Sequence, residues 1–152
     1  MWIELTKARV IPRISPDEYG AILEFDKESH EPGQDLLQEI IDAVLAEMRA
    51  AIAQCEKNTL DARSNTIPHS CLNDALAMVA YHIGTRVGMP IEASKDPRYN
   101  AWIKARENLD KLRTCAITVE DPSTGTVGDS GSNGASIAFG TCTRMDRRSW
   151  RF

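Results

Sequence analysis

The chain has 152 residues, of which 42% are hydrophobic and 26% charged, and its formal net charge is −4. These values are typical of one soluble globular domain with a substantial core. No uncharged apolar stretch approaches the ~20 residues that a bilayer-spanning helix needs, so we expect no transmembrane helix. No basic region leads into an apolar one after Met1, so we expect no secretory signal and a protein made and kept in a cytosol.

The four cysteines are widely spaced and never form a C-x-x-C pair: Cys55, Cys71, Cys115 and Cys142. Cytosolic reductants keep thiols reduced, so this pattern favours four free thiols over disulfides. We expect Cys55 and Cys71 to be small buried groups of the core.

The chain opens with an extended segment, Trp2 to Leu5, followed by Thr6 as a possible helix N-cap. A stronger start signal is Ser15-Pro16-Asp17-Glu18, in which serine caps, proline suits the first helical position and Glu18 completes a capping box. This motif predicts a short helix from Pro16 to about Glu24, and residues 26–33 should form a polar connector.

Residues 34–55 give the strongest helical pattern of the chain. Its main apolar stripe recurs at helical spacing and is made by Leu37, Ile41, Val44, Met48 and Ile52. A stripe on so long a helix predicts either a contact with a neighbouring subunit or a central core helix, and the spacing alone leaves both open. The acidic residues follow the side away from this stripe: Asp35, Glu39, Asp42 and Glu47. They indicate a face that is solvated or meets basic residues of a neighbour.

Residues 57–66 form a polar loop, after which Ile67-Pro68 predicts the start of a helix that runs to about Val87. Gly88-Met89-Pro90 ends that helix. Asp96 as N-cap and Pro97 at the first helical position predict a last helix that ends near Arg113.

Beyond residue 113 the pattern changes. Ala116 to Val119 and Ser136 to Thr141 are typical of short strands, and a glycine-rich linker lies between them at residues 123–134. The expected fold is therefore mainly α, a small helical bundle of one short and three longer helices, with an extended C-terminal tail carrying one or two short strands. We divide the chain into a helical domain, residues 1–113, and a tail, residues 114–152.

No residue pattern supports catalysis or metal binding. The nearest candidate, His69-Ser70-Cys71, has no second Cys/His pair at useful spacing, and a helix-start histidine beside a core cysteine explains it better. The sequence contains no G-x-S-x-G, no P-loop, no H-E-x-x-H, and no G-x-G-x-x-G between a strand and a helix. We expect no enzyme activity, no catalytic residue, no metal and no cofactor.

The tail differs from an ordinary linker because it carries apolar, aromatic and arginine side chains. Tryptophan and arginine often contribute much of the binding energy of protein interfaces. Two explanations are open on composition alone: the tail packs back on the body, or it docks on a partner. If the tail docks on a partner, the residues expected to bind are Ile137, Phe139, Arg144, Arg147, Arg148, Trp150, Arg151 and Phe152.

Several different motifs, taken in order, cover nearly the whole chain. They are a Trp-Ile-x-Leu-Thr start (Trp2 to Thr6), the Ser-Pro-x-Glu helix, the long amphipathic helix, the helix opened by Ile67-Pro68, an Asp-Pro-Arg-Tyr helix start (Asp96 to Tyr99) with Ala105 and Leu109, and the closing Arg147-Arg148-Ser149-Trp150-Arg151-Phe152. In this order they resemble the head–tail connector (adaptor, or head-completion) family of tailed phages, most closely its Mu-like prophage branch. The glycine-rich linker and the polar loop at residues 57–66 depart from the family pattern.

The resemblance implies a structural virion protein of the neck, assembled in the host cytoplasm as a ring of about twelve copies beneath the portal. Its terminal segment, here roughly residues 135–152, would bind the portal protein, and the ring would offer a platform to the next neck protein, a stopper or tail terminator. Genomic DNA would pass through the lumen without specific binding, and no membrane is implied. The acidic face of the long helix and the basic face of the last one could then meet between subunits.

The main alternative is a small helical DNA-binding or packaging protein, similar to a terminase small subunit. It needs a recognition helix or a basic patch, and neither is evident outside the C-terminal arginines. A second alternative is an enzyme with a non-obvious site, which requires a polar pocket that holds titratable groups of perturbed pKa.

Overall fold

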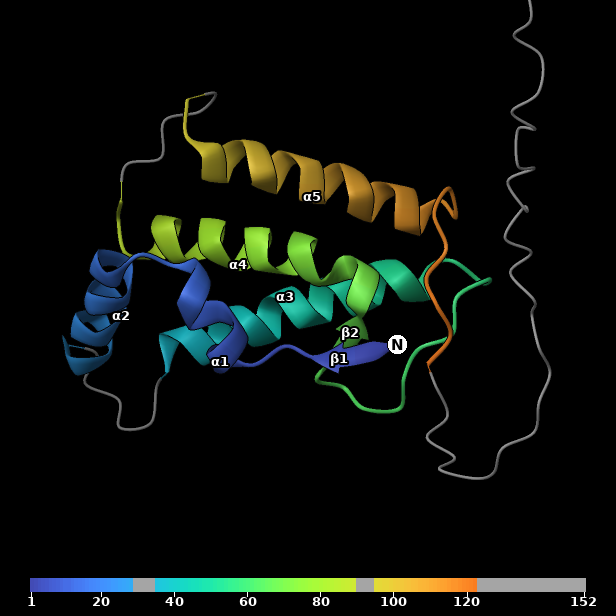
Figure 1. Cartoon of the computed structure of the whole chain (residues 1–152), viewed down its shortest axis with the longest axis horizontal. Coiled ribbons are helices and arrows are strands. Elements are labelled where there is room, and N and C mark those ends of the chain that lie inside the picture. The colour runs from blue at the N-terminus through green and yellow to red at the C-terminus, as the bar shows by residue number, and fades with distance from the viewer. Residues whose placement is uncertain (29–34, 90–94, 123–152) are drawn as a thin grey trace, which may run out of the picture.

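The computed structural model describes residues 1–28, 35–89 and 95–122 (Figure 1). In chain order the elements are β1 (Trp2–Glu4), α1 (Lys7–Val10), the 3-10 turn η1 (Ile11–Arg13), α2 (Pro16–Glu28), α3 (Leu36–Ala53), β2 (Thr66–Pro68), the 3-10 turn η2 (His69–Cys71), α4 (Leu72–Arg86) and α5 (Pro97–Arg113). The mainly α fold expected from the sequence is confirmed. The strand expected at residues 136–141 lies outside the described residues.

The three long helices α3, α4 and α5 pack on one another and alternate in direction, so α3 and α5 finish at the same end of the bundle (Figure 1). The β1–β2 sheet lies near that end, and α2 lies at the other. Within the described ranges, no helix combines the length and the apolar character that a bilayer span requires.

α3 is the central core helix. It begins as its sequence predicts, since the Asp35 side chain accepts a hydrogen bond from the Gln38 amide at 3.0 Å. The five stripe residues offered as a subunit interface are at most 3% exposed within the single chain: Leu37, Ile41, Val44, Met48 and Ile52. The other helices and β2 already pack against α3. The subunit-contact interpretation therefore does not hold for these side chains, which belong to the core.

The capping box predicted for α2 is confirmed. The Ser15 hydroxyl accepts a hydrogen bond from the Glu18 amide at 3.2 Å, and the Glu18 carboxylate accepts one from the Ser15 amide at 2.8 Å. Glu18, only 6% exposed, also pairs with Arg98 of α5, whose guanidinium bonds the α5 cap Asp96 at 2.7 Å. Burial raises the pKa of Glu18, but the hydrogen bonds from Ser15 and Arg98 outweigh it and hold this pKa below its ordinary value. The same carboxylate therefore caps α2 and joins it to α5.

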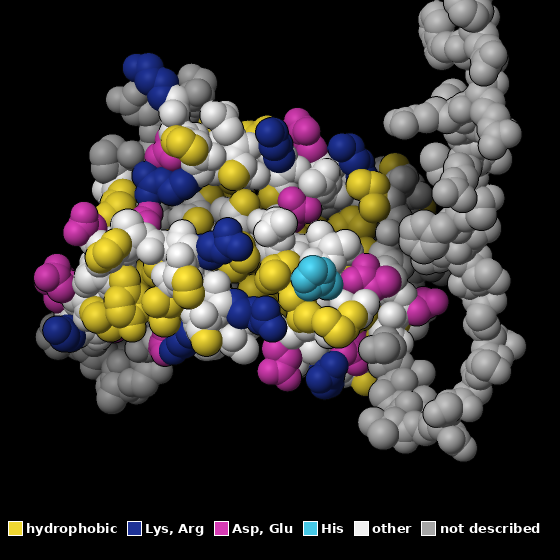
Figure 2. Space-filling model, viewed as in Figure 1, with side chains coloured by type: hydrophobic (Ala, Val, Ile, Leu, Met, Phe, Trp, Pro, Cys, Tyr) yellow, Lys and Arg dark blue, Asp and Glu magenta, His cyan; other side chains and the backbone are white. Residues whose placement is uncertain are grey.

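α2 continues to Glu28, beyond the predicted end near Glu24, and leaves apolar side chains on the surface. Leu23 and Phe25 are 42% and 43% exposed. Figure 2 shows hydrophobic side chains gathered over α2 on the face in view. This end of the bundle thus presents an apolar patch that the other described residues leave exposed.

The helix start expected at Ile67-Pro68 is wrong. Residues 66–68 form β2, which pairs antiparallel with β1 and places Ile67 opposite Ile3, and α4 begins only at Leu72. Proline is tolerated at this strand end because the next amide, that of His69, donates to the Met1 carbonyl at 3.0 Å. Pairing with a distant strand buries Ile67 fully, which a local helix signal does not reveal.

The strand expected at Ala116 to Val119 is also wrong. The Ala116 and Ile117 amides both donate to the Lys111 carbonyl, at 2.8 and 3.2 Å, and the Val119 amide donates to the Asn58 side chain at 3.0 Å. These bonds occupy the amides that a partner strand would have bound. Because residues 114–122 lie against the bundle in this way, we place the end of the body at Pro122 rather than at residue 113.

Replacing Ile41 with alanine tests its assignment to the core. Ile41 is 0% exposed, so the substitution should lower the free energy of unfolding by about 2–5 kcal/mol, whatever the oligomeric state. Urea titration of the full chain measures this change. The control Leu23→Ala, at an exposed position, should cost under about 1 kcal/mol. An equally small effect of Ile41→Ala would contradict the core assignment.

Candidate functional site

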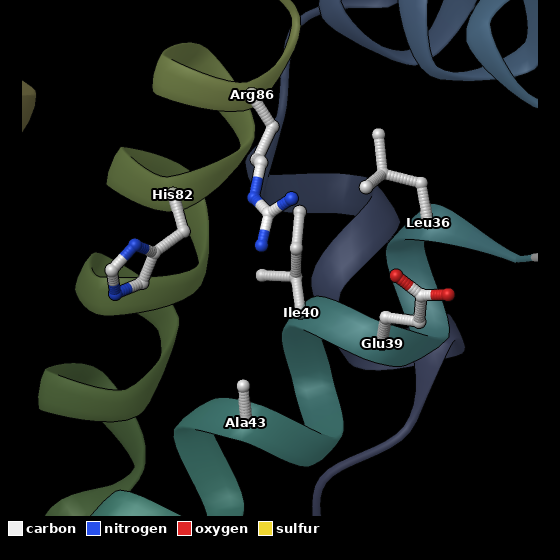
Figure 3. A pocket seen from close by; sticks show the side chains of 6 residues that line it. All are labelled: Leu36, Glu39, Ile40, Ala43, His82 and Arg86. Atoms are coloured by element: carbon white, nitrogen blue, oxygen red, sulfur yellow. The ribbon is translucent and has the colours of Figure 1, made fainter.

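A small cavity of about 160 Å³ lies between α3 and α4. Its lining is drawn in Figure 3: Leu36, Glu39, Ile40, Ala43, His82 and Arg86. Burial lowers the pKa of His82 and favours its neutral form. The Arg86 guanidinium extends toward Ile40 (Figure 3), so the lining combines apolar side chains with one cation, Arg86, and one carboxylate, Glu39. Small-molecule sites usually measure about 300–1,000 Å³, so this cavity suits a single side chain better than a substrate.

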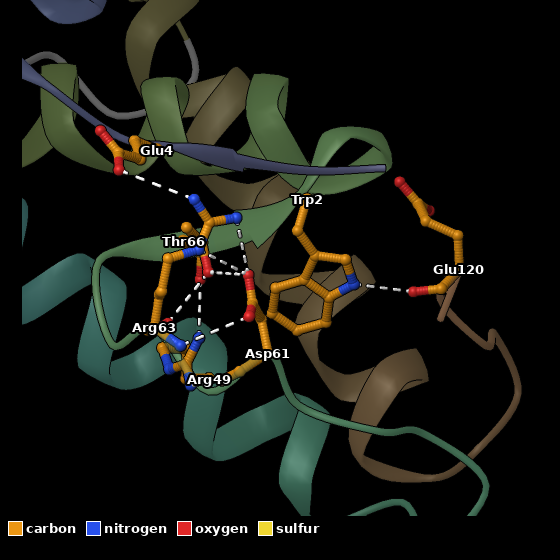
Figure 4. A network of polar contacts seen from close by, with 7 residues as sticks. All are labelled: Trp2, Glu4, Arg49, Asp61, Arg63, Thr66 and Glu120. Atoms are coloured by element: carbon orange, nitrogen blue, oxygen red, sulfur yellow. Dashed lines mark hydrogen bonds and ion pairs between the residues drawn. The ribbon is translucent and has the colours of Figure 1, made fainter. Parts of the chain in front are cut away.

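A polar network joins the loop after α3 to the sheet (Figure 4). Arg49 of α3 donates to the carbonyls of Thr66 and Asp61, at 2.8 and 2.7 Å, and its guanidinium lies 5.7 Å from the centre of the Trp2 ring. Thr66 is 0% exposed, and its hydroxyl lies 2.9 Å from both the Asp61 carboxylate and the Arg63 carbonyl. The network satisfies the buried hydroxyl and fixes the path of the loop, which is a structural role.

Residues far apart in the sequence meet at Glu120. We define the Glu120 cluster as Met1, Trp2, Ser70 and Glu120. The Trp2 ring is 5% exposed, and its Nε1–H donates to the Glu120 carbonyl at 2.8 Å. The Glu120 carboxylate accepts hydrogen bonds from the Ser70 hydroxyl at 2.8 Å and from the N-terminal ammonium at 3.3 Å. The cluster therefore fixes the point from which residues 123–152 continue.

The Glu120 carboxylate is held in its charged form. Burial raises its pKa, but hydrogen bonds from its own amide, from Ser70 and from the N-terminal ammonium lower the pKa from 4.5 to about 2. A carboxylate with a lowered pKa stabilises the folded chain above its ordinary pKa, and this contribution disappears as the pH falls toward the folded value.

A disulfide joins Cys55 to Cys115, so the expectation of four reduced thiols is wrong. Cys55 follows α3 and Cys115 follows α5, and their Cα atoms lie 5.2 Å apart. Cys115 has a φ of 57°, which turns the chain sharply as it leaves α5. The signal in the sequence was that each of the two cysteines lies just after a helix. It was overlooked because cysteines of a cytosolic protein are expected to stay reduced.

Cys71 is buried and free, as expected for a core cysteine. Burial raises the pKa of its thiol to about 11, so the thiol stays protonated at neutral pH and reacts slowly. Its neighbour His69 is exposed at the start of η2. Across residues 1–28, 35–89 and 95–122, no group of three His, Cys, Asp or Glu side chains could hold a metal ion.

The acidic side of α3 is partly used within the chain. Glu47 pairs with Arg106 of α5 and lies 3.7 Å from Arg113, while Asp35 pairs with Lys7. Glu39 and Asp42 remain exposed. The sequence suggested that the acidic face of α3 meets the basic face of α5 of another subunit. At Glu47 the two helices instead meet within one chain, through Arg106 and Arg113.

The eight docking residues expected in the tail lie outside the described residues: Ile137, Phe139, Arg144, Arg147, Arg148, Trp150, Arg151 and Phe152. The structure therefore places the base of the tail and not its tip.

Searches with this chain matched no protein-family model, no curated protein and no solved structure.

Replacing Glu120 with glutamine should weaken the fold in a pH-dependent way. At pH 7 the variant should lose about 1 kcal/mol of unfolding free energy, because a partly exposed carboxylate loses two charge-assisted hydrogen bonds. The difference from the unaltered chain should shrink as the pH falls from 4.5 toward 2. Urea titrations at pH 7, 5, 4 and 3 measure it, with Asp121→Asn as the exposed control. A difference that stays constant across this series would refute the assigned role.

Proposed function

We propose that this chain is a structural head–tail connector subunit of a tailed phage, which forms a ring beneath the portal and joins capsid to tail. The proposal rests on the family resemblance of its motifs. The observation that favours it in the fold is the Glu120 cluster, which fixes the base of a long arginine- and aromatic-containing segment to one end of a helical body. A fixed base determines which part of a neighbouring protein a docking segment of given length can reach.

The segment beyond the body has the reach and the chemistry for docking. Residues 123–152 would span at most about 100 Å when fully extended. The last nine residues carry four arginines and one aspartate, so the other 143 residues are more acidic than the net charge of −4 suggests. Guanidinium groups bind carboxylates in paired hydrogen bonds, and tryptophan fills apolar pockets, so this segment suits an acidic and partly apolar groove on a portal protein.

A ring also needs two different complementary patches on each subunit. Exposed apolar side chains lie on elements at the two ends of the bundle: Leu23 and Phe25 on α2, and Met1 before β1 and Ile117 after α5. These four side chains replace the buried stripe of α3 as the surfaces we expect neighbouring copies to cover.

The acidic body is compatible with a DNA channel, because DNA must slide past the ring without strong phosphate contacts. In the alternative reading, a DNA-binding packaging protein, the C-terminal arginines would contact phosphate. The salt dependence of DNA binding distinguishes the two hypotheses, since the affinity of a protein for DNA phosphates falls steeply as the salt concentration rises.

Co-sedimentation with the portal ring of the same phage tests the proposal. The full chain should bind, and a chain ending at Pro122, which keeps all the described contacts, should bind at least about tenfold more weakly. A second variant changes Arg144, Arg147, Arg148 and Arg151 to glutamine and should show a similar loss at full length. Circular dichroism should show unchanged helix content in both.

Equal binding by all three chains would keep the connector and reject the docking role of the tail. If no chain binds an intact portal but the full chain shifts DNA in a salt-sensitive gel assay, the packaging alternative replaces the connector.

A further inference from the structure

Cys55 and Cys115 lie where the C-terminal segment meets the body. Cys55 begins the loop that contains Asn58, and Cys115 begins the segment that contains Val119 and Glu120. Their Cα separation of 5.2 Å falls within the range that a disulfide spans without backbone movement. The same backbone can therefore hold the pair either as two thiols or as a disulfide.

The geometry points to a redox-dependent lock: the pair is a dithiol in a reducing compartment and a disulfide in an oxidising one, and the disulfide fixes the base of the C-terminal segment to the loop after α3. Assigning the dithiol to assembly and the disulfide to the finished particle rests on the proposed function, because a virion assembled in a reducing cytosol later leaves it.

The contacts around the pair explain what the lock controls. Without the covalent bond, the segment is held to the body by the partly buried Val119 side chain and by polar contacts, among them the Val119 amide to Asn58 at 3.0 Å and the Trp2 indole to the Glu120 carbonyl at 2.8 Å. Water competes for such bonds at the edge of a fold, so the segment opens more often. The disulfide joins positions 60 residues apart and keeps the loop and the segment together when these bonds open.

The reaction is thiol–disulfide exchange with a small thiol such as glutathione. Cys115 is partly exposed whereas Cys55 is buried, so the attacking thiolate reaches the Sγ of Cys115. The Cys55–Cys115 bond breaks, Cys55 leaves as a thiolate and takes up a proton, and Cys115 forms a mixed disulfide. A second small thiol then attacks the mixed disulfide, which releases the Cys115 thiol and one oxidised small disulfide. Oxidation reverses these steps, with the small disulfide as the two-electron oxidant.

The chain has two further cysteines, Cys71 and Cys142. The Cys71 thiol is buried and protonated at neutral pH, so it does not compete in the exchange. Cys142 lies outside the described residues, and a Cys142→Ser background removes it as a possible partner.

The test uses the full chain in that background, equilibrated with reduced and oxidised glutathione in varied ratios. Alkylation followed by mass spectrometry should show Cys55 and Cys115 changing together in one two-electron transition, with Cys71 unaffected. Hydrogen exchange should then be at least about tenfold faster at the Ala116, Ile117 and Val119 amides in the dithiol, while the α3 core amides stay protected. The double variant Cys55→Ser/Cys115→Ser should match the dithiol in every buffer, and Cys71→Ala should keep the transition.

Two results would overturn the lock. One is that Cys55 and Cys115 stay alkylatable in the folded chain under oxidised glutathione. The other is equal protection of residues 116–119 in both redox states, measured on the unaltered cysteine pair so that no folding defect of a variant intervenes. Neither measurement involves a portal, so the lock and the connector role can fail independently.

Discussion

The burial of one helix organises this protein. α3 is amphipathic, and nine of its residues are buried. Each large apolar side chain that leaves water contributes about 1.5–3 kcal/mol, so no arrangement that exposes this stripe competes with the observed one. α1, α2, α4, α5 and β2 all contact α3, and the stripe is consumed inside the chain. The surfaces left for partners are consequently the two ends of the bundle and the outer helices.

The features that the sequence predicted correctly depend on neighbouring residues. Ser15 and Glu18 lie three positions apart, and Asp96-Pro97 begins α5 as its local chemistry requires. A periodic apolar pattern likewise predicted α3 to within two residues at each end. Such signals act within one helical turn or repeat along one helix face, so a single sequence contains the information needed to interpret them.

The features that sequence reasoning missed depend on contacts between distant segments. Ile67 resembles the start of a helix until Ile3 pairs with it across the small sheet. The Cys55–Cys115 bond appears only when α3 and α5 are known to finish at the same end. The candidate site has the same character, since nothing around Glu120 in the sequence indicates that Trp2 and Ser70 will reach it. To predict the Glu120 cluster, one would first have to know in which direction each of α3, α4 and α5 runs through the bundle.

The Trp2–Glu120 contact also affects how the chain folds during synthesis. The two residues are 118 positions apart, and ribosomes add roughly 5–20 residues per second, so the indole is made about 6–24 s before its acceptor exists. β1 precedes every other described element in the chain, yet its contact at Glu120 is completed among the last in the body. During that interval β1 can already pair with β2 and Trp2 can lie against Arg49, but the indole Nε1–H still lacks its acceptor, so the last bond that holds the start of the chain to residue 120 forms late.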